Sequence, residues 1–502
     1  MIDTQMMGQA FALLLDWQLL WLIPAGLLYG VIVGAIPGMT ASLGIALVMP
    51  FTFHMTAIEA LVFLSSIFTG GVYGGSITAI ILNMPGSPAS AATGFDGFAM
   101  ARNGQQNEAQ GYAIGASALG SLFAAVLVLV LLKPIATFAL MFGPVEMLMV
   151  GVFALTIVAS FKGETLGKGI LAGGLGLLLG TVGVSWGGVY RATFGNMWLI
   201  DGLPVVPVIL GILAMPGLFA LAGESFVVND ALLRRPNFRK QLHGMIDSAR
   251  YKMLLLRSTL IGVVVGALPA AGSSVASLVS WHSAKQSEKN NTIGDGDSRG
   301  VIASESANNA SEMGSTAVML ALGIPGGGAT AIMLGAFLIH GLTPGPRLLA
   351  ENLDLGYAVF LAQFLQVALL PIAGLLVIAF STWILKVPNQ VLVPIVLAIT
   401  CWGVFATRET FFDIGLLIGF GLLAYVMQRY GYPPIALLLG IILSDMLEPE
   451  LIRAVATFDA VNLPNVILTR PIPLVLVLLT IISLYYSFRR RAQVKANDPE
   501  TA

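Results

Sequence analysis

A proline and three glycines interrupt a long apolar stretch in the second half of this chain. The sequence from Gly323 to Gly328 reads Gly-Ile-Pro-Gly-Gly-Gly, and residues 317–322 and 331–339 beside it are apolar. This sequence cannot continue a regular helix, because Pro lacks an amide donor and Gly is conformationally loose. At membrane depth, non-helical backbone is tolerated only where protein buries it or where it lines a watery cavity. We therefore predict a broken membrane helix that restarts near Thr330 and points bare N–H groups into a cavity.

Hydrophobic residues make up 57% of the 502-residue chain, and charged residues make up only 10%. Soluble proteins carry about 25% charged residues, so the composition predicts an all-α polytopic membrane protein. The apolar segments predict about 12 transmembrane spans plus re-entrant hairpins. The net charge of −1 gives no reason to expect nucleic acid as a partner.

A second break of the same kind lies in the first half of the chain. Asn83 to Ser90 reads Asn-Met-Pro-Gly-Ser-Pro-Ala-Ser and precedes the other break by about 240 residues. The motif from Val33 to Pro37 likewise recurs, as the similar motif from Val265 to Pro269. Two broken helices in matching positions of two halves indicate the binding site of a secondary transporter. We predict two repeats with their breaks near the membrane midplane, inverted if each repeat crosses the membrane an odd number of times.

The two predicted repeats are separated by a polar, basic segment. Residues 223–251 contain Arg234, Arg235, Arg239, Lys240 and Arg250. The excess of basic residues in cytoplasmic loops places this segment in the cytoplasm. The predicted organisation is an N-terminal segment (1–16), repeat 1 (17–222), a cytoplasmic linker (223–251), repeat 2 (252–455), a C-terminal span (456–488) and a cytoplasmic tail (489–502).

Polar groups at the two breaks form the predicted substrate site. Neither break contains Lys or Arg, and the nearest bases, Arg102 and Arg347, lie beyond the apolar runs. Helix termini, backbone N–H groups and bound cations are therefore expected to supply the positive potential for an anion. The predicted substrate-binding residues are Asn83, Gly86, Ser87, Ser90, Thr316, Gly326, Gly327 and Thr330.

Oxygen atoms near the breaks are predicted to hold a coupling cation. Glu305, Asn308, Asn309 and Glu312 fall on one face of a helix, and carboxylate and amide oxygens suit a hard cation. The alternative for this face is a helix end solvated at the membrane surface. Asp96 is a further acid in apolar sequence, either functional or at a loop edge. The predicted Na⁺ ligands are Pro37, Thr40, Ser42, Ser273, Ser274, Glu305, Asn308 and Asn309, with Glu312 and Asp96 as additional candidate acids.

Several of these motifs resemble those of the TctA family, the large permease subunits of bacterial tripartite tricarboxylate transporters. The resemblance covers about residues 17–455. It is carried by Pro37-Gly38, Tyr73-Gly74-Gly75-Ser76, Asn83-Met84-Pro85-Gly86, Asp96-Gly97, Glu305-Ser306-Ala307-Asn308-Asn309-Ala310, Gly323-Ile324-Pro325-Gly326 and His340-Gly341-Leu342-Thr343-Pro344-Gly345-Pro346. One departure is Ala270, which follows Pro269 where the first copy has Gly38.

The resemblance implies a permease of the bacterial inner membrane that imports a tricarboxylate or dicarboxylate with an ion gradient. The ion is usually Na⁺, with H⁺ as the alternative. Two partners are implied: a small TctB-like membrane subunit of about four helices and a periplasmic TctC-like binding protein. An elevator-type movement is expected only by analogy with other carriers.

Two other classes of protein compete with the transporter. A membrane hydrolase would use Ser273 or Ser274 as nucleophile, but the sequence offers no His or Lys base at motif spacing. A passive channel would conduct ions without saturable, stereoselective uptake. We therefore expect a transporter and no enzymatic activity.

Overall fold

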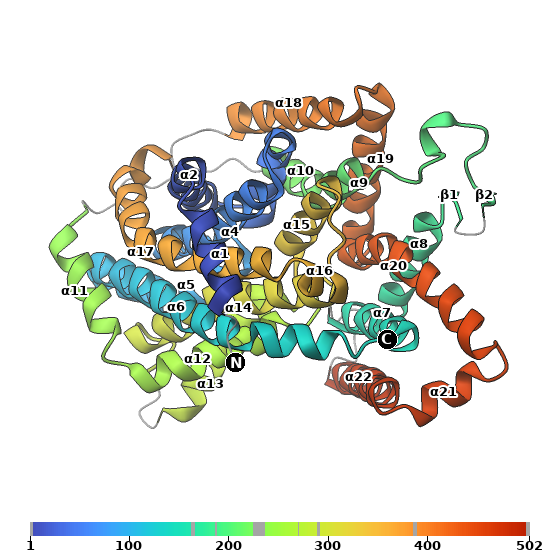
Figure 1. The fold of residues 1–502 in the computed structure, drawn as a ribbon. Coiled ribbons are helices and arrows are strands. Elements are labelled where there is room, and N and C mark those ends of the chain that lie inside the picture. The colour runs from blue at the N-terminus through green and yellow to red at the C-terminus, as the bar shows by residue number, and fades with distance from the viewer. Residues whose placement is uncertain are drawn as a thin grey trace. The chain divides into compact units, whose positions relative to one another are not determined.

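The computed structural model describes residues 4–161, 166–185, 188–223, 236–269, 271–288, 292–384 and 389–497. Within these ranges all regular secondary structure is helical apart from an antiparallel ribbon, in which β1 (Gly183–Val184) pairs with β2 (Tyr190–Arg191) (Figure 1). The predicted all-α class is confirmed. Among the described residues, five helices are long and apolar enough to cross a membrane, or six if the bent pair Leu463–Thr469 and Pro471–Tyr485 forms one span.

The chain forms two compact units, each built from two separate segments. Unit 1 comprises Met1–Thr137 and Gly217–Gly403, and unit 2 comprises Phe138–Pro216 and Val404–Ala502. Each unit therefore takes one segment from each half of the sequence. Unit 1 contains both breaks and all of the predicted site residues.

The first segment of unit 1 contains the first break. Its elements are α1 (Thr4–Leu14), α2 (Trp17–Gly34), α3 (Ala41–Val48), the 3₁₀ helix η1 (Met49–His54), α4 (Ala57–Leu82), the 3₁₀ helix η2 (Pro88–Ser90), α5 (Ala91–Arg102) and α6 (Gln106–Ala139). A capping box starts α4: the Thr56 hydroxyl accepts from the Glu59 amide, and the Glu59 carboxylate accepts from the Thr56 amide. Nearly all of α4 is buried, so it forms the centre of unit 1.

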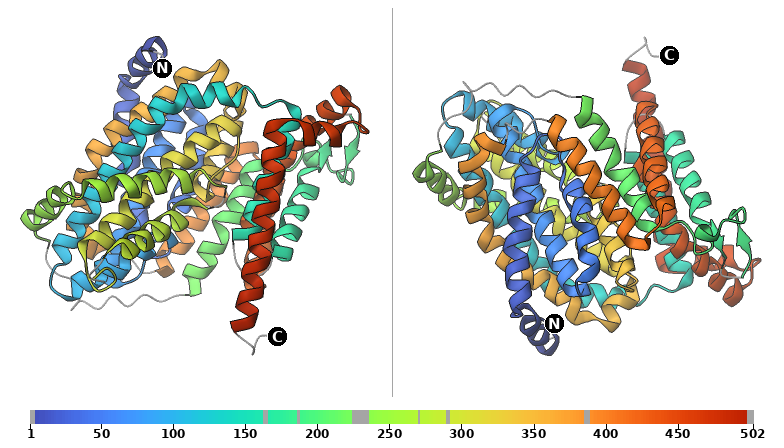
Figure 2. Two further views of the ribbon diagram at one scale, coloured as in Figure 1. Left: turned by 90° about the horizontal axis from the view of Figure 1, so that it is seen from below. Right: turned by 90° about the horizontal axis from the view of Figure 1, so that it is seen from above.

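The second segment of unit 1 repeats this order of elements around the second break. Its elements are α11 (Phe238–Ser248), α12 (Lys252–Gly266), α13 (Gly272–Ser287), α14 (Ser298–Leu322), α15 (Gly328–Ile339), α16 (Pro346–Glu351), α17 (Leu353–Ile384) and α18 (Asn389–Arg408). Helices α12, α13 and α14 pack against one another (Figure 2). The helix predicted to restart near Thr330 begins at Gly328.

Equivalent small residues bring the second and fourth α-helices of each segment together. In the first segment, a Cβ on Gly30 would overlap the Ile67 carbonyl oxygen between α2 and α4. In the second, a Cβ on Gly262 would overlap the Ala307 carbonyl oxygen between α12 and α14. The two segments therefore share their helix packing as well as the order of their elements.

Replacing Gly30 by Ala is expected to destabilise unit 1. The new Cβ meets backbone rather than a flexible side chain, so α2 must move away from α4 at a cost of about 1–3 kcal/mol. The matched control is Gly8→Ala in α1, where a Cβ meets nothing within 4 Å. Melting in detergent should show a loss for Gly30→Ala and no loss for Gly8→Ala, and equal melting temperatures would contradict the packing argument.

Unit 2 is built from α7 (Pro144–Phe161), α8 (Leu166–Gly180), the 3₁₀ helix η3 (Met197–Leu199), α9 (Val205–Leu213), α19 (Phe411–Arg429), α20 (Pro434–Phe458), α21 (Leu463–Thr469) and α22 (Pro471–Asn497). Helix α10 (Met215–Gly223) begins at the end of its first segment, and most of this helix belongs to unit 1. Helix α20 packs against α7 and α8, α19 against α9, and α22 against α7. Ion pairs join its two segments, such as Arg191 with Glu448 and Arg470 with Glu146. The predicted linker residues Arg234 and Arg235 lie outside the described residues.

Candidate functional site

The first break occurs where the sequence predicts it. Helix α4 ends at Leu82, and Asn83 adopts a left-handed conformation with φ 56°. Gly86 is buried, and a Cβ there would overlap the Gly34 carbonyl oxygen, so the loop packs directly on the end of α2. The hydroxyls of Ser87 and Ser90 are buried and have no hydrogen-bond partner in the described ranges, which leaves two donors at the start of η2 and α5.

The second break is more enclosed than the first. Gly323 ends α14 with φ 72°, and residues 323–326 are buried, whereas residues 83–85 are exposed. The Thr330 hydroxyl accepts from the Gly327 amide and donates to the Gly327 carbonyl, so it closes the first turn of α15. A Cβ on Gly326 would overlap the Ser315 hydroxyl. Of the predicted substrate residues here, Thr330 is thus already engaged within its own helix.

A cavity of about 510 Å³ opens beside the first break. Asn83, Arg102 and Lys285 line it together with aromatic rings, and the Lys285 ammonium lies 5.2 Å from the centre of the Trp281 ring. Sequence reasoning placed Arg102 beyond the apolar run and passed over Lys285. Two cations and an amide at one cavity give it the character of an anion-binding vestibule.

The hydroxyls predicted to bind Na⁺ start the two short helices next to the breaks. Thr40 caps α3 by accepting from the Leu43 amide. Ser42, Ser273 and Ser274 are partly buried in the first turns of α3 and α13. At the start of α13, Gly272 approaches Gly326 and Gly327 of the second break. Pro37 is buried and precedes α3. The structure thus places these candidates near the breaks.

The polar stretch of α14 is buried rather than solvated. Every residue from Gly300 to Ala317 is buried, which contradicts the alternative of a helix end at the membrane surface. Glu305 points toward α5 and α6, where its two oxygens accept from the hydroxyls of Thr93 and Ser117. Among the described residues, no Lys or Arg pairs with either Glu305 or Glu312.

Glu312 belongs to a separate buried network with α4 and α17. Its Oε1 accepts from the Thr69 hydroxyl at 2.7 Å and from the Gln363 amide at 3.2 Å. The Thr69 hydroxyl also lies 3.2 Å from Gln363 Oε1 and 2.9 Å from Gln366 Oε1, yet it has one proton to donate. Three side-chain oxygens, those of Glu312, Gln363 and Gln366, therefore compete for one hydroxyl proton.

Three more buried oxygens near these groups lack a donor. Within the part of the chain that the structure describes, Glu312 Oε2, Asn308 Oδ1 and Asn309 Oδ1 have no hydrogen-bond partner. The amide nitrogens of the two asparagines donate to the carbonyls of Val72 and Thr69, which orients them toward α4. Buried acceptors without donors are costly, and a hard cation would satisfy carboxylate and amide oxygens together. Carboxylate and amide oxygens of this kind are the ligand type that a hard cation such as Na⁺ prefers.

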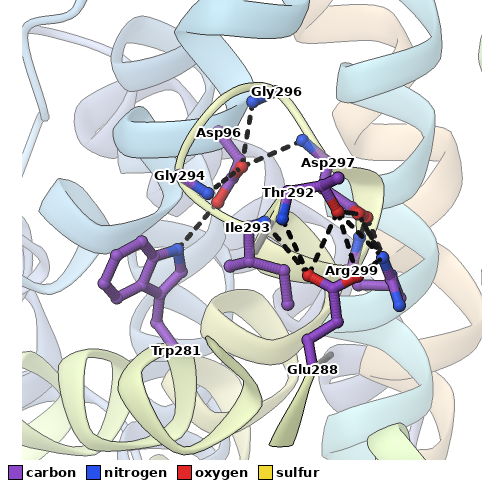
Figure 3. A network of polar contacts seen from close by, with 9 residues as sticks. All are labelled: Asp96, Trp281, Glu288, Thr292, Ile293, Gly294, Gly296, Asp297 and Arg299. Atoms are coloured by element: carbon purple, nitrogen blue, oxygen red, sulfur yellow. Dashed lines mark hydrogen bonds and ion pairs between the residues drawn. The ribbon is translucent and has the colours of Figure 1, made fainter. Parts of the chain in front are cut away.

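Asp96 lies on α5 and is fully buried, so the alternative of a loop edge is wrong. Its Oδ1 accepts from the backbone amides of Gly294, Gly296 and Asp297 at 2.7–3.1 Å, and its Oδ2 accepts from the Trp281 indole at 2.7 Å (Figure 3). A ring of backbone N–H groups is a favourable environment for a carboxylate. These contacts are structural: three of them fasten α5 to the loop before α14, and the fourth joins α5 to Trp281 of α13.

The loop around Asp96 is held by its own ion pairs. Arg299 binds Glu288 and Asp297, each at 2.5 Å (Figure 3). Burial disfavours the charge of Asp297, but hydrogen bonds from Arg299 and Thr292 outweigh it and hold the pKa of this carboxyl below its usual value. A Cβ on Gly300 would overlap the Asp96 carboxylate, so a glycine is required at that position.

The comparisons with known proteins agree with the sequence motifs. Residues 20–439 match the family described as the tripartite tricarboxylate transporter TctA family. The "Uncharacterized 52.8 kDa protein in TAR-I ttuC' 3'region" of Agrobacterium vitis is 33% identical over 438 residues, which cover 86% of this chain and 85% of that protein. The "Uncharacterized protein in TAR-II ttuC' 3'region" of the same organism is 34% identical over 194 residues, 38% of this chain and 80% of that protein. No solved structure matches.

Proposed function

Because the chain belongs to the tripartite tricarboxylate transporter TctA family, a family of transporters and not of enzymes, we propose that it imports a small dicarboxylate or tricarboxylate by symport with Na⁺. In this proposal it is the large permease subunit in a bacterial inner membrane. It works with a small TctB-like membrane subunit and receives substrate from a periplasmic TctC-like binding protein. These two partners follow from the family.

The observation that carries the coupling proposal is the set of buried oxygens without donors around Glu312. Among the described residues, Asn308, Asn309 and Glu312 of α14 each have one buried oxygen that no donor reaches. The side-chain oxygens of Gln363 and Gln366 of α17 compete for one hydroxyl proton. A cation carried with the substrate would be bound by these oxygens. Protonation of Glu312 would also remove one unpaired acceptor, so H⁺ coupling is the second candidate.

The two breaks support a substrate site for an anion in unit 1. Asn83, Ser87 and Ser90 offer donors at the first break, and the vestibule with Arg102 and Lys285 adjoins it. Backbone N–H groups at the starts of α5 and α15 add positive potential. In our proposal, the vestibule bases attract the carboxylate and the breaks bind it. Thr316, Gly326, Gly327 and Thr330 form the second half of the site.

Reciprocal packing supports the proposal that the repeats are related by a two-fold axis. Helix α3 of the first segment packs on α15 of the second, while α13 of the second packs on α5 and η2 of the first. The equivalent helices α4 and α14 pack on each other. Such exchange of partners is typical of two-fold symmetry. We propose inverted repeats with about 12 spans in total and the breaks at the midplane, in a domain that moves by an elevator mechanism.

Uptake of labelled citrate and other carboxylates tests the function. Vesicles would hold this chain, its small subunit and the binding protein, with an inward Na⁺ gradient, a proton gradient or neither. We expect accumulation with Na⁺ alone. Accumulation with the proton gradient alone would support H⁺ coupling, and equilibration without concentration would overturn the symport proposal in favour of a channel.

Variants at the breaks locate the substrate within the same assay. Bulky residues at Asn83 or Thr330 are expected to abolish uptake while the three-component complex still assembles. At Asn83 the new side chain would intrude on the vestibule. At Thr330 it would also remove the hydroxyl that closes the first turn of α15. Normal uptake by either assembled variant would count against this site.

A further inference from the structure

A groove beside α12 has no role in the transport site. It has a volume of about 520 Å³ and lies between α12 and the C-terminal end of α13. Most of its walls are apolar, and its lining includes Met253, Leu254, Leu256, Leu260, Ala284 and Ile293. An apolar groove at the side of a membrane protein can bind the acyl chains of a lipid. The polar groups that line the groove then determine which lipid headgroup binds.

Arg257 gives the groove a cation with unused donors. Its Nη1 donates to the Ser287 hydroxyl at 2.6 Å, whereas Nε and Nη2 are buried and have no hydrogen-bond partner among the described residues. The nearby carboxylate of Glu288 is bound by Arg299. Burying charged donors without an acceptor is unfavourable. The Nε and Nη2 groups of this guanidinium can therefore donate hydrogen bonds to the oxygen atoms of an anion.

The outer face of α12 continues from the groove as an apolar stripe. Met253, Leu260 and Val264 are 79%, 44% and 63% exposed and follow one another at helical spacing with Leu256. In a protein that spans a membrane, such a stripe contacts acyl chains. The basic residues Arg250 and Lys252 directly precede it, as expected for the cytoplasmic end of a membrane helix.

We propose that this groove binds an anionic phospholipid of the cytoplasmic leaflet. The headgroup phosphate accepts from Nε and Nη2 of Arg257, because the planar guanidinium matches two phosphate oxygens at once. The acyl chains lie along the stripe from Met253 to Val264. Negatively charged lipids on the cytoplasmic side and a basic pocket between helices provide complementary charge.

The test is lipid retention by the purified complex after reconstitution in vesicles of equal phosphatidylglycerol and phosphatidylcholine. Native mass spectrometry counts the lipids that remain bound after detergent extraction. We expect selective retention of phosphatidylglycerol by the wild type, and binding about tenfold weaker in Arg257→Gln, which loses a charge-assisted contact. Lys252→Gln is the matched control, because Lys252 is exposed and lies outside the groove.

Leu260→Trp provides a second test of lipid binding if the Arg257→Gln complex does not assemble. Leu260 is 44% exposed, so the larger ring fills the groove without disturbing the core and should expel the lipid. Equal retention by wild type and the assembled variants would overturn the proposal, and so would an equal loss in Lys252→Gln. Displacement of phosphatidylglycerol by millimolar inorganic phosphate would assign the site to a free anion instead.

Discussion

Glu312→Gln is expected to weaken coupling to Na⁺ more than any other conservative change in unit 1. The substitution keeps the shape of the side chain and an acceptor for Thr69, but it removes the charge from a cluster with several unpaired oxygens. A hydrogen-bonded or ionic contact to a buried charge is worth about 1.5–3 kcal/mol. The Na⁺ concentration that gives half-maximal uptake should therefore rise by about tenfold to a hundredfold. Uptake measured over a series of Na⁺ concentrations gives this value.

Variants of two other carboxylates test whether the effect on Na⁺ dependence is specific to this cluster. Glu305→Gln should shift the Na⁺ dependence less, because both Glu305 oxygens already have hydroxyl donors. Glu108→Gln should leave it unchanged, since Glu108 forms a surface ion pair with Lys240 that is worth about 0–1 kcal/mol. If Glu312→Gln kept the wild-type Na⁺ dependence, the cation would have to bind elsewhere.

The breaks could be predicted because their cause is local. Prolines and glycines within six to eight residues end a helix whatever surrounds them, and Asn83 and Gly323 indeed adopt left-handed conformations there. The repeated order of elements also follows from short motifs at matching positions. The sequence spacing predicts that the polar residues of α14 share one face of the helix. It does not predict that this face is buried, since Glu305 to Glu312 has the composition of a solvated helix.

The partners of that face could not be predicted, because they lie far away in the sequence. Gln363 and Gln366 are isolated polar residues in an apolar helix, and the contact of Gln363 with Glu312 closes only in the folded unit. Lys285 was overlooked for the same reason: nothing near it in sequence indicates that α13 faces Asn83 and Arg102. The partners of Asp96 were the hardest to predict, since they are mostly backbone amides, which every residue except Pro carries.

Asp96→Ala is expected to destabilise unit 1 strongly without touching the proposed cation cluster. The change leaves three backbone amides and the Trp281 indole without their acceptor in a buried place. Each unpaired donor costs about 1–3 kcal/mol, so even with partial access of water the loss should be about 3 kcal/mol or more. The apparent melting temperature of the purified complex measures it.

Two variants separate the role of the carboxylate from a general effect on the loop. Asp96→Asn keeps one oxygen for the three amides of the loop but turns an N–H group toward the Trp281 indole, so it should lose less than Asp96→Ala. Asp295→Ala changes an exposed acid in the same loop and should stay within about 0.5 kcal/mol of the wild type. If Asp96→Ala melted like the wild type, its four contacts would not be what holds α5 to α13 and to the loop before α14. If that stable variant also lost uptake, Asp96 would instead be assigned to the substrate or cation site.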